Sequence, residues 1–100
     1  MNLRLTDAAR DDLRAAHTFF SERSPQAGDR AVGALLKAAN GLTRFSLLGK
    51  HGAIEGTRER LVVSFPYRII YQVENDHVVV LRIIHTARPW PPPAQADRED

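Results

Sequence analysis

Hydrophobic residues in the first part of the chain follow a short alternating segment and then a helical stripe. Residues 3–5 alternate apolar, polar and apolar side chains, which predicts a short strand. Thr6 or Asp7 then offers an oxygen that can cap the N-terminus of a helix. Apolar residues follow at steps of four, three and four, at Ala9, Leu13, Ala16 and Phe20. This pattern predicts a first helix that ends before Ser24 and Pro25.

A second helix is predicted directly after the first. Ser24 is a good N-cap, and Pro25 suits the first helical position, where its missing N–H costs nothing. Apolar side chains again recur at steps of three and four, at Ala27, Ala31, Leu35, Ala38, Leu42 and Phe45. Because the connection is short and the alanines are small, the two helices are predicted to form a closely packed antiparallel hairpin.

The second half of the chain changes to the two-residue period of a β-sheet. Residues 46–56 contain three glycines and predict a loop. Strands and turns are then predicted in alternation, over residues 58–63, 64–66, 67–74, 75–76 and 78–85. The predicted fold is therefore α+β with the order β-α-α-β-β-β, in which a helical hairpin packs on one face of a small antiparallel sheet.

The last two predicted strands have two unequal faces. With a two-residue turn at residues 75–76, the face expected to receive the helices contains Tyr67, Ile69, Tyr71, Val73, Val78, Val80, Arg82 and Ile84. The opposite face contains an apolar strip of Val79, Leu81 and Ile83, beside Leu61 or Val63 of the preceding strand. Two consecutive helices cover only one side of a sheet, so the strip is predicted to be covered by the C-terminal tail or by a partner protein.

Arg82 is the only charged residue on the face that is predicted to receive the helices. A buried charge without a partner is costly, so Arg82 is expected to pair with an acid of the first helix. Asp12 flanks the apolar stripe between Ala9 and Ala16. The sequence therefore predicts a structural ion pair between Arg82 and Asp12.

The composition is that of one ordinary globular domain. A chain of 100 residues and 11.2 kDa suits a single core, which we place at residues 1–88, followed by a Pro-rich, acidic tail at residues 89–100. The absence of cysteine excludes disulfides, thiolate metal sites and cysteine nucleophiles. The four histidines lack metal-ligand spacing, and no phosphate-binding glycine loop or nucleophile elbow is present. No metal or cofactor is therefore expected.

Charge and hydropathy restrict the class of partner only loosely. No segment approaches the roughly 20 apolar residues of a membrane helix, and the first residues lack the apolar stretch of a signal peptide. The cytoplasm is the expected location. The formal net charge is +2, but residues 37–88 carry eight Lys or Arg against four acids. This basic half is compatible with a polyanionic partner and equally with a mildly basic, solvated surface.

Two sets of residues suit a specific role. Arg58, Arg60, Arg68 and His85 lie on the predicted sheet and have the types needed for RNA cleavage, in which a base activates the 2′-hydroxyl and cations stabilise the phosphorane. Without a catalytic role, Arg58 and Arg60 would be solvated strand residues and His85 would only end a strand. Trp90 either packs the tail onto the domain or anchors a partner, because tryptophan is frequent at interface hot spots.

The order of elements and three sequence segments resemble the RelE/ParE superfamily of type II toxins. The segments are residues 5–13 at the start of the first helix, residues 66–71 (Pro-Tyr-Arg-Ile-Ile-Tyr), and residues 78–85 followed by Arg88-Pro-Trp90. The resemblance covers residues 1–90. It implies one of two activities: RelE-like members cleave mRNA on the ribosome, and ParE-like members poison DNA gyrase without catalysis.

The details of the resemblance favour the ParE-like, plasmid-stabilisation branch. Arg68 stands where the nucleases place an arginine, but no lysine occurs from residue 51 onward and no tyrosine after Tyr71. The ending at residues 83–90 resembles ParE. We therefore expect a toxin that binds gyrase, with Arg88 and Trp90 in the contact and no catalytic residues.

Two alternatives to the gyrase toxin stay open. One is a ribosome-dependent RNase that uses Arg68, His85, Arg58 and Arg60, and the other is a degenerate toxin that only binds an antitoxin. The resemblance implies a cognate antitoxin, expected to be of the ribbon-helix-helix type and encoded beside the gene. A segment of the antitoxin would cross the sheet and helices. The apolar strip supplies its expected contacts, at Leu61, Val63, Val79, Leu81 and Ile83.

Overall fold

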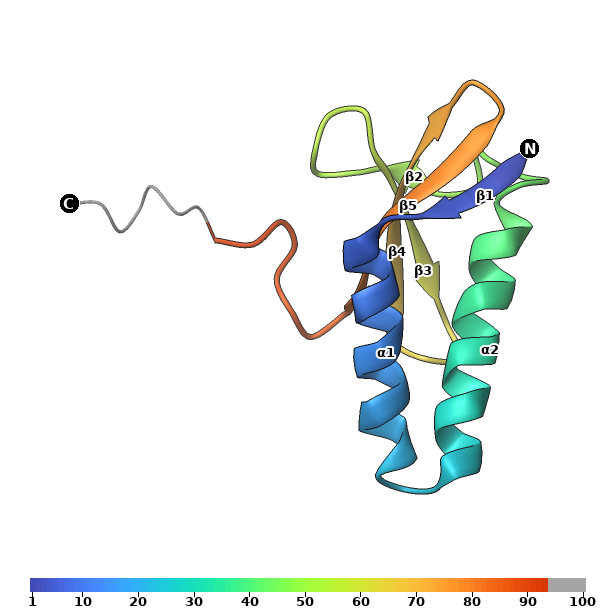
Figure 1. Cartoon of the computed structure of the whole chain (residues 1–100). Helices are drawn as coiled ribbons and strands as arrows, with labels where there is room; N and C mark the ends of the chain where they lie inside the picture. Colours follow the sequence, from blue (N-terminus) through green and yellow to red (C-terminus); the bar gives the residue numbers. More distant parts are fainter. Residues whose placement is uncertain (94–100) are drawn as a thin grey trace.

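Two helices pack against a five-stranded sheet in the computed structural model, which describes residues 1–93 (Figure 1). The elements are β1 (Asn2–Leu5), α1 (Asp7–Ser21), α2 (Pro25–Gly41), β2 (Lys50–His51), β3 (Arg58–Val62), β4 (Tyr67–Glu74) and β5 (His77–His85). The predicted α+β order is confirmed, and β2 adds a short strand within the expected loop. The end of the predicted tail, residues 94–100, lies outside the described residues.

The sheet is mixed, with the strand order β1-β5-β4-β3-β2. β1 runs parallel to β5, whereas the other neighbouring pairs are antiparallel. The prediction of an antiparallel sheet is therefore wrong at this edge. β1 is followed by the helical hairpin and not by a strand, so no β-hairpin forces it to run antiparallel to its neighbour.

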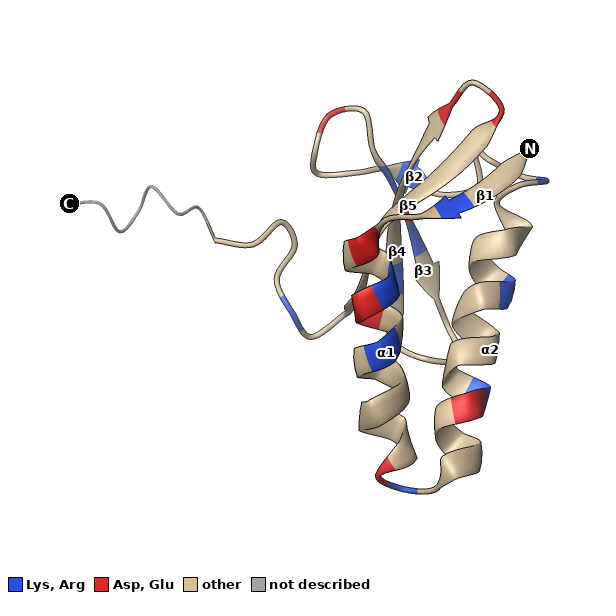
Figure 2. Cartoon of the chain, in the orientation of Figure 1, with Lys and Arg blue, Asp and Glu red and all other residues tan. Residues whose placement is uncertain are grey.

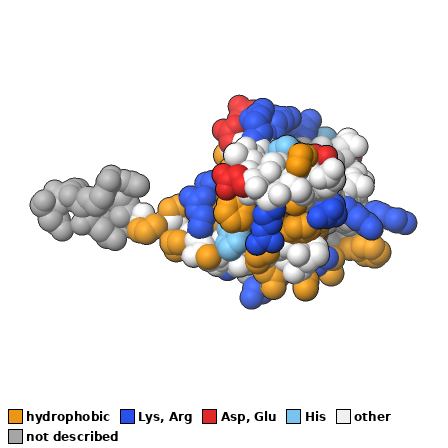
Figure 3. Space-filling view, turned by 90° about the horizontal axis from the view of Figure 1, so that it is seen from below, with side chains coloured by type: hydrophobic (Ala, Val, Ile, Leu, Met, Phe, Trp, Pro, Cys, Tyr) orange, Lys and Arg blue, Asp and Glu red, His pale blue; other side chains and the backbone are white. Residues whose placement is uncertain are grey.

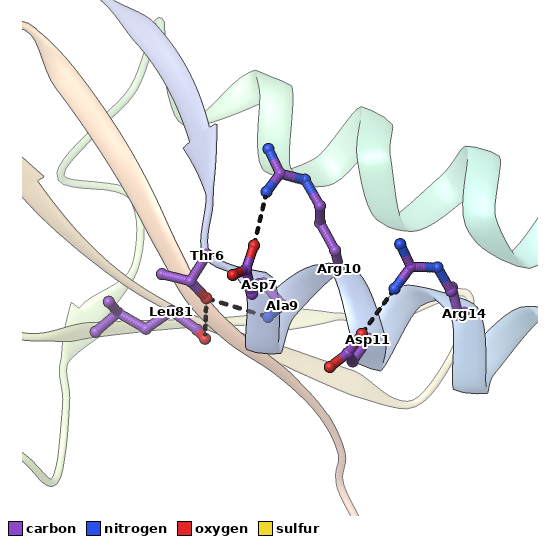
Figure 4. Close-up of polar contacts among 7 residues, drawn as sticks. All are labelled: Thr6, Asp7, Ala9, Arg10, Asp11, Arg14 and Leu81. Carbon is purple, nitrogen blue, oxygen red and sulfur yellow. Dashed lines mark hydrogen bonds and ion pairs between the residues drawn. The ribbon is translucent and has the colours of Figure 1, made fainter.

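Thr6 and Ser24 fix the starts of the two helices, as their sequence positions predict. The hydroxyl oxygen of Thr6 accepts a hydrogen bond from the Ala9 N–H at 3.1 Å, and that of Ser24 accepts one from the Ala27 N–H at 3.1 Å. The Thr6 hydroxyl also donates to the carbonyl of Leu81 at 2.8 Å (Figure 4). Thr6 therefore both caps α1 and joins its N-terminus to β5.

The core lies between the helical hairpin and one face of the sheet. The helices contribute Ala9, Ala16, Leu35, Ala39 and Leu42, and the sheet contributes Val62, Tyr67, Ile69, Tyr71, Val78, Val80 and Ile83. Because several of the buried helix residues are alanines, the two helices pack closely against each other and against the sheet. Phe45, predicted on the second stripe, does not join the core, because α2 ends at Gly41 and the following turns leave the Phe45 side chain 64% exposed.

A β-bulge changes the two faces of β5. Ile70 pairs with Arg82, but the next residue of β4, Tyr71, pairs with Val80, so Leu81 is an extra residue in β5. Beyond the bulge the alternation of side chains is reversed. Ile83 therefore lies in the core with 2% exposure.

The prediction that Arg82 and Ile84 face the helices, and that Ile83 faces away from them, is wrong for these positions. The prediction assumed that a two-residue turn fixes which residues of β5 face the helices. This holds only where the two strands pair without a bulge. In the structure Arg82 and Ile84 share the face of Ile70 and Arg68, which no helix covers.

The face without helices is nevertheless not open at its centre. Ile70 and Ile84 are buried, although Leu61 on the same face is 57% exposed. The segment that follows β5 contributes to this burial, because Pro89 and Trp90 line a shallow pocket together with Ile84. The C-terminal segment therefore covers part of this face of the sheet, beside the aliphatic parts of Arg82 and Arg88.

Candidate functional site

The structure brings Arg82 and Asp12 together at the edge of β5. Arg82 Nε lies 2.8 Å from Asp12 Oδ2, and Arg82 Nη2 lies 3.0 Å from Oδ1. The backbone N–H of Ile83 also donates to Asp12 Oδ2 at 2.8 Å. Side-chain exposure is 28% for Arg82 and 11% for Asp12. The hydrogen bond to Asp12 raises the pKa of Arg82 above its usual value, so Arg82 stays charged at neutral pH.

This ion pair forms although Arg82 lies on the other face from the one predicted. β1 pairs with β5 only as far as Val80, so the edge of β5 is open beyond that residue. Asp12 reaches this open edge from α1 and accepts the otherwise unpaired N–H of Ile83. The Arg82 guanidinium also lies 5.9 Å from the centre of the Trp90 ring. Trp90 thus packs the C-terminal segment against the domain.

Arg68 lies on the face that no helix covers, beside an acid. Its Nη1 is 3.7 Å from Glu59 Oε1, and the Glu59 side chain is only 11% exposed. The other carboxylate oxygen of Glu59 accepts a hydrogen bond from the Ala53 N–H at 2.9 Å. The positive charge of Arg68 is therefore partly neutralised by Glu59.

Arg58 and Arg60 project from the helix-covered side of β3, because they pair with Tyr71 and Ile69. Arg58 donates to the carbonyl of Gly49 at 2.6 Å and so holds the loop before β3. Arg60 lies beside α2, and its Nε is buried without a hydrogen-bond partner within residues 1–93. These two arginines point away from Arg68.

His85 lies on the helix-covered side at the end of β5. Its ring packs edge-on against Tyr67 with 5.2 Å between ring centres. Its Nδ1 accepts a hydrogen bond from the Ala87 N–H at 3.0 Å. Because Tyr67 pairs with His85 and Arg68 with Ile84, the side chains of His85 and Arg68 project from opposite faces of the sheet. The four residues considered for RNA cleavage are therefore not assembled around one point.

A broad groove with a volume of about 720 Å³ lies between α2 and β3. Its walls include exposed apolar side chains, Phe45 at 64%, Leu48 at 53% and Val63 at 89%. Lys37 and Arg60 add positive charge to the same groove. We call this surface the α2/β3 groove.

Only one member of the predicted apolar strip, Val63, lines the α2/β3 groove. Val79 and Leu81 are half-buried, Leu61 lies on the other face, and Ile83 belongs to the core with 2% exposure and faces the helices, away from Leu61. Sequence reasoning missed Phe45 and Leu48 as surface residues. The sequence did contain an indication of this surface: the segment just before Gly49 is rich in apolar residues, and such a composition is unusual for a solvated loop.

Residues 1–93 contain no group of three or more His, Asp or Glu side chains placed to hold a metal ion. In the same part of the chain, neither helix has the length and hydrophobicity needed to cross a membrane.

Comparison with known proteins identifies the family. Residues 3–90 match the family described as the ParE toxin of the type II toxin-antitoxin system parDE. Toxin RelE3 of Caulobacter vibrioides is 36% identical over 88 residues, which cover 85% of this chain and 94% of that protein. The family carries the name ParE, whereas this relative carries the name RelE.

Solved structures with the same fold come from toxin–antitoxin systems. A chain of the chromosomal ParDE system from P. aeruginosa superimposes with a TM-score of 0.78 at 22% identity, over 85% of this chain and 95% of that chain. A chain of the toxin–antitoxin complex RelBE2 from Mycobacterium tuberculosis gives a TM-score of 0.59 at 29% identity, over 84% and 95%. The match over residues 3–90, together with the fold, shows that this chain belongs to the ParE toxin family of type II toxin–antitoxin systems, within the RelE/ParE superfamily.

Proposed function

We propose that this toxin acts by binding DNA gyrase, with Arg88 and Trp90 in the contact, and that it does not cleave RNA. The observation that carries the proposal is the separation of Arg68 and His85 on opposite faces of the sheet. A general base and the cations that stabilise a phosphorane must reach the same phosphate. Inhibition by binding needs only a complementary surface, and Trp and Arg are common anchors of such surfaces.

The ribosome-dependent RNase is the second candidate. It is favoured by the similarity to a protein named toxin RelE3 and by the position of Arg68 on the face without helices. Arg68 has Glu59 beside it, and this acid would oppose the approach of a phosphate. A toxin that has lost activity and only binds its antitoxin is the third candidate.

One preparation of the purified protein, tested in two assays, separates these candidates. We expect the protein to stabilise gyrase-cleaved DNA and to leave ribosome-bound mRNA uncut. Arg68→Ala is expected to keep gyrase inhibition within a few-fold of wild type, because Arg68 has no catalytic task in a binding toxin and lies outside the proposed contact. A combined Arg88→Ala and Trp90→Ala variant, checked for folding by circular dichroism, is expected to lose most of the inhibition.

The opposite pattern would contradict the gyrase proposal. Cleavage of mRNA that falls by a factor of about 10²–10⁴ in the His85→Ala or Arg68→Ala variant, without any effect on gyrase, would support the RNase. Inactivity of the wild-type protein in both assays would support the antitoxin-binding partner.

We also propose that a cognate antitoxin of the ribbon-helix-helix type lies in the α2/β3 groove and crosses the edge of β3. Three exposed apolar side chains and two basic ones in this groove suit a segment that combines apolar and acidic residues. Val63 belongs to this surface, and Leu61, Val79 and Leu81 are proposed contacts if the segment continues across the other face.

Charge substitutions in the α2/β3 groove are expected to weaken antitoxin binding. Val63→Asp and Phe45→Asp should each raise the Kd for the antitoxin encoded beside the gene by about tenfold or more, since each places a carboxylate in an apolar contact. Isothermal titration calorimetry measures the change. Ile54→Asp is the control, because Ile54 is 42% exposed and lies outside the groove. If all three variants bound the antitoxin with equal affinity, this placement would be contradicted. A separate variant, Leu61→Asp, tests whether the antitoxin segment continues across the other face of the sheet.

A further inference from the structure

A second cleft, between α1 and the end of β5, is separate from the α2/β3 groove. It has a volume of about 340 Å³, and Ala15, Phe19 and Ile83 form its apolar wall. Its polar lining comes from Asp12, Tyr67, His85 and Arg88. Hydrophobic, histidine and basic side chains gather beside the start of the C-terminal segment in the view from below (Figure 3). We call this surface the α1/β5 cleft.

The polar groups of the α1/β5 cleft are hydrogen-bond donors. Both oxygens of Asp12 are already occupied by Arg82 and the Ile83 N–H, so this acid offers little to a ligand. His85 accepts a hydrogen bond at Nδ1, which places the proton of the neutral ring on Nε2. Arg88 forms no ion pair within residues 1–93. A ligand must therefore supply the acceptors.

Tyr67 adds a neutral hydroxyl donor to this set. Burial raises the pKa of Tyr67, the charge of Asp12 raises it further, and Arg88 opposes this effect. The phenol is therefore protonated at neutral pH. Tyr67, Asp12 and Arg88 all line the cleft.

We propose that the α1/β5 cleft binds a carboxylate that lies next to an apolar side chain in a peptide segment of a protein partner. Arg88, with the donors of Tyr67 and His85, would hold the carboxylate, while Ala15, Phe19 and Ile83 would contact the apolar side chain. Phe19 is 58% exposed in the isolated chain, and such a ligand would cover it.

The charges around the cleft favour a single carboxylate over a nucleic acid. Asp11 lies one helical turn before Ala15, and Glu22 lies three residues after Phe19, so acids flank both ends of the apolar wall. In the coloured ribbon of Figure 2, the acidic positions of α1 lie mainly in its first half, with basic positions between them. A phosphate chain would have to pass several of these acids, of which Asp11 is paired with Arg14. One carboxylate inside the cleft would meet Arg88 and a single acid, Asp12, whose charge is paired with Arg82.

The inference extends the binding role proposed above for Arg88, but its test needs neither gyrase nor antitoxin. The probe is N-acetyl-Leu-Phe with a free C-terminal carboxylate, titrated into the full-length protein and followed by NMR. The peptide is expected to change the NMR chemical shifts of Phe19 and His85. The peptide with the free carboxylate should bind at least about tenfold more tightly than the same peptide with a C-terminal amide. Arg88→Gln should abolish this difference between acid and amide, and Arg44→Gln, an exposed arginine outside the cleft, should preserve it.

Three results would overturn the inference. The first is equal affinity of acid and amide, or no shifts at Phe19 and His85. The second is tighter binding of a short single-stranded RNA at the same residues, which would assign the cleft to nucleic acid. The third concerns a variant in which Asp97, Glu99 and Asp100 of this chain are changed to Asn, Gln and Asn. If this variant shifts the NMR signals of Phe19 and His85, and if only this variant binds the free-acid peptide, the cleft is occupied by the chain's own C-terminus.

Discussion

Asp12→Ala is expected to lower the free energy of unfolding by about 3 kcal/mol, near the lower end of the range for breaking a buried ion pair. The substitution leaves the charge of Arg82 without its partner and the backbone N–H of Ile83 without an acceptor. A buried, unsatisfied N–H by itself costs about 1–3 kcal/mol. The partial exposure of Arg82, 28%, allows some rehydration and keeps the expected loss from being larger.

Asp11→Ala provides a matched control for the Asp12 prediction. Asp11 is on the same helix and pairs with Arg14 at 2.6 Å, but both side chains are more than 70% exposed. Removing such a surface pair should change stability by only about 0.5 kcal/mol or less. Urea unfolding of both variants, followed by circular dichroism, measures the difference. Similar midpoints for Asp11→Ala and Asp12→Ala would show that the Asp12 contacts contribute little to the fold.

Arg82→Met separates the two contributions of Asp12. In this variant the carboxylate keeps the Ile83 N–H but loses the guanidinium. If both contacts matter, the loss from Arg82→Met should be smaller than the loss from Asp12→Ala. The combined variant then gives the coupling energy between the two side chains.

Gly49→Ala is expected to destabilise the protein by about 2–3 kcal/mol, because a methyl group does not fit at this position. A Cβ at Gly49 would lie 2.7 Å from the Tyr71 hydroxyl and 2.8 Å from the carbonyl oxygen of Glu59. Neither atom moves freely. Tyr71 is fully buried, and its hydroxyl donates to the Ser46 carbonyl at 2.8 Å and accepts from the Gly49 N–H at 2.9 Å.

Gly33→Ala is the control, since a Cβ there meets no other atom within 4 Å. Gly33 lies inside α2, where alanine is preferred over glycine by about 0.5–1 kcal/mol. The two glycine variants should therefore change the melting temperature in opposite directions. A Gly49→Ala variant as stable as wild type would mean that the segment around residues 46–49 adapts without loss of the Tyr71 contacts.

The chemistry of the candidate sites was only partly accessible from the sequence. Arginine and histidine content indicated which residues were worth considering, but their grouping depended on which face each strand position occupies. The four residues considered for RNA cleavage are divided between both faces, and Phe45 lies in a groove instead of in the core. No local pattern specified these positions.

The sequence by itself determined the two helices, the other four strands and their order, but not the short strand β2. Helix starts at Thr6 and Ser24, the two apolar stripes and the turn at residues 75–76 are local features, because caps and turns are decided by the backbone needs of a few adjacent residues. The sequence also predicted that Arg82 needs an acidic partner, since the cost of an unpaired buried charge does not depend on the details of the fold.

Only the tertiary structure decided which side chains of β5 face the helices. The extra residue at Leu81 arises where β5 leaves its pairing with β1 and is bonded instead by Thr6 and Asp12. These contacts join residues more than 70 positions apart in the chain. Because strand register is a property of a pair of strands, one unpaired residue reverses every later position, and nothing in the local alternation of β5 signals it.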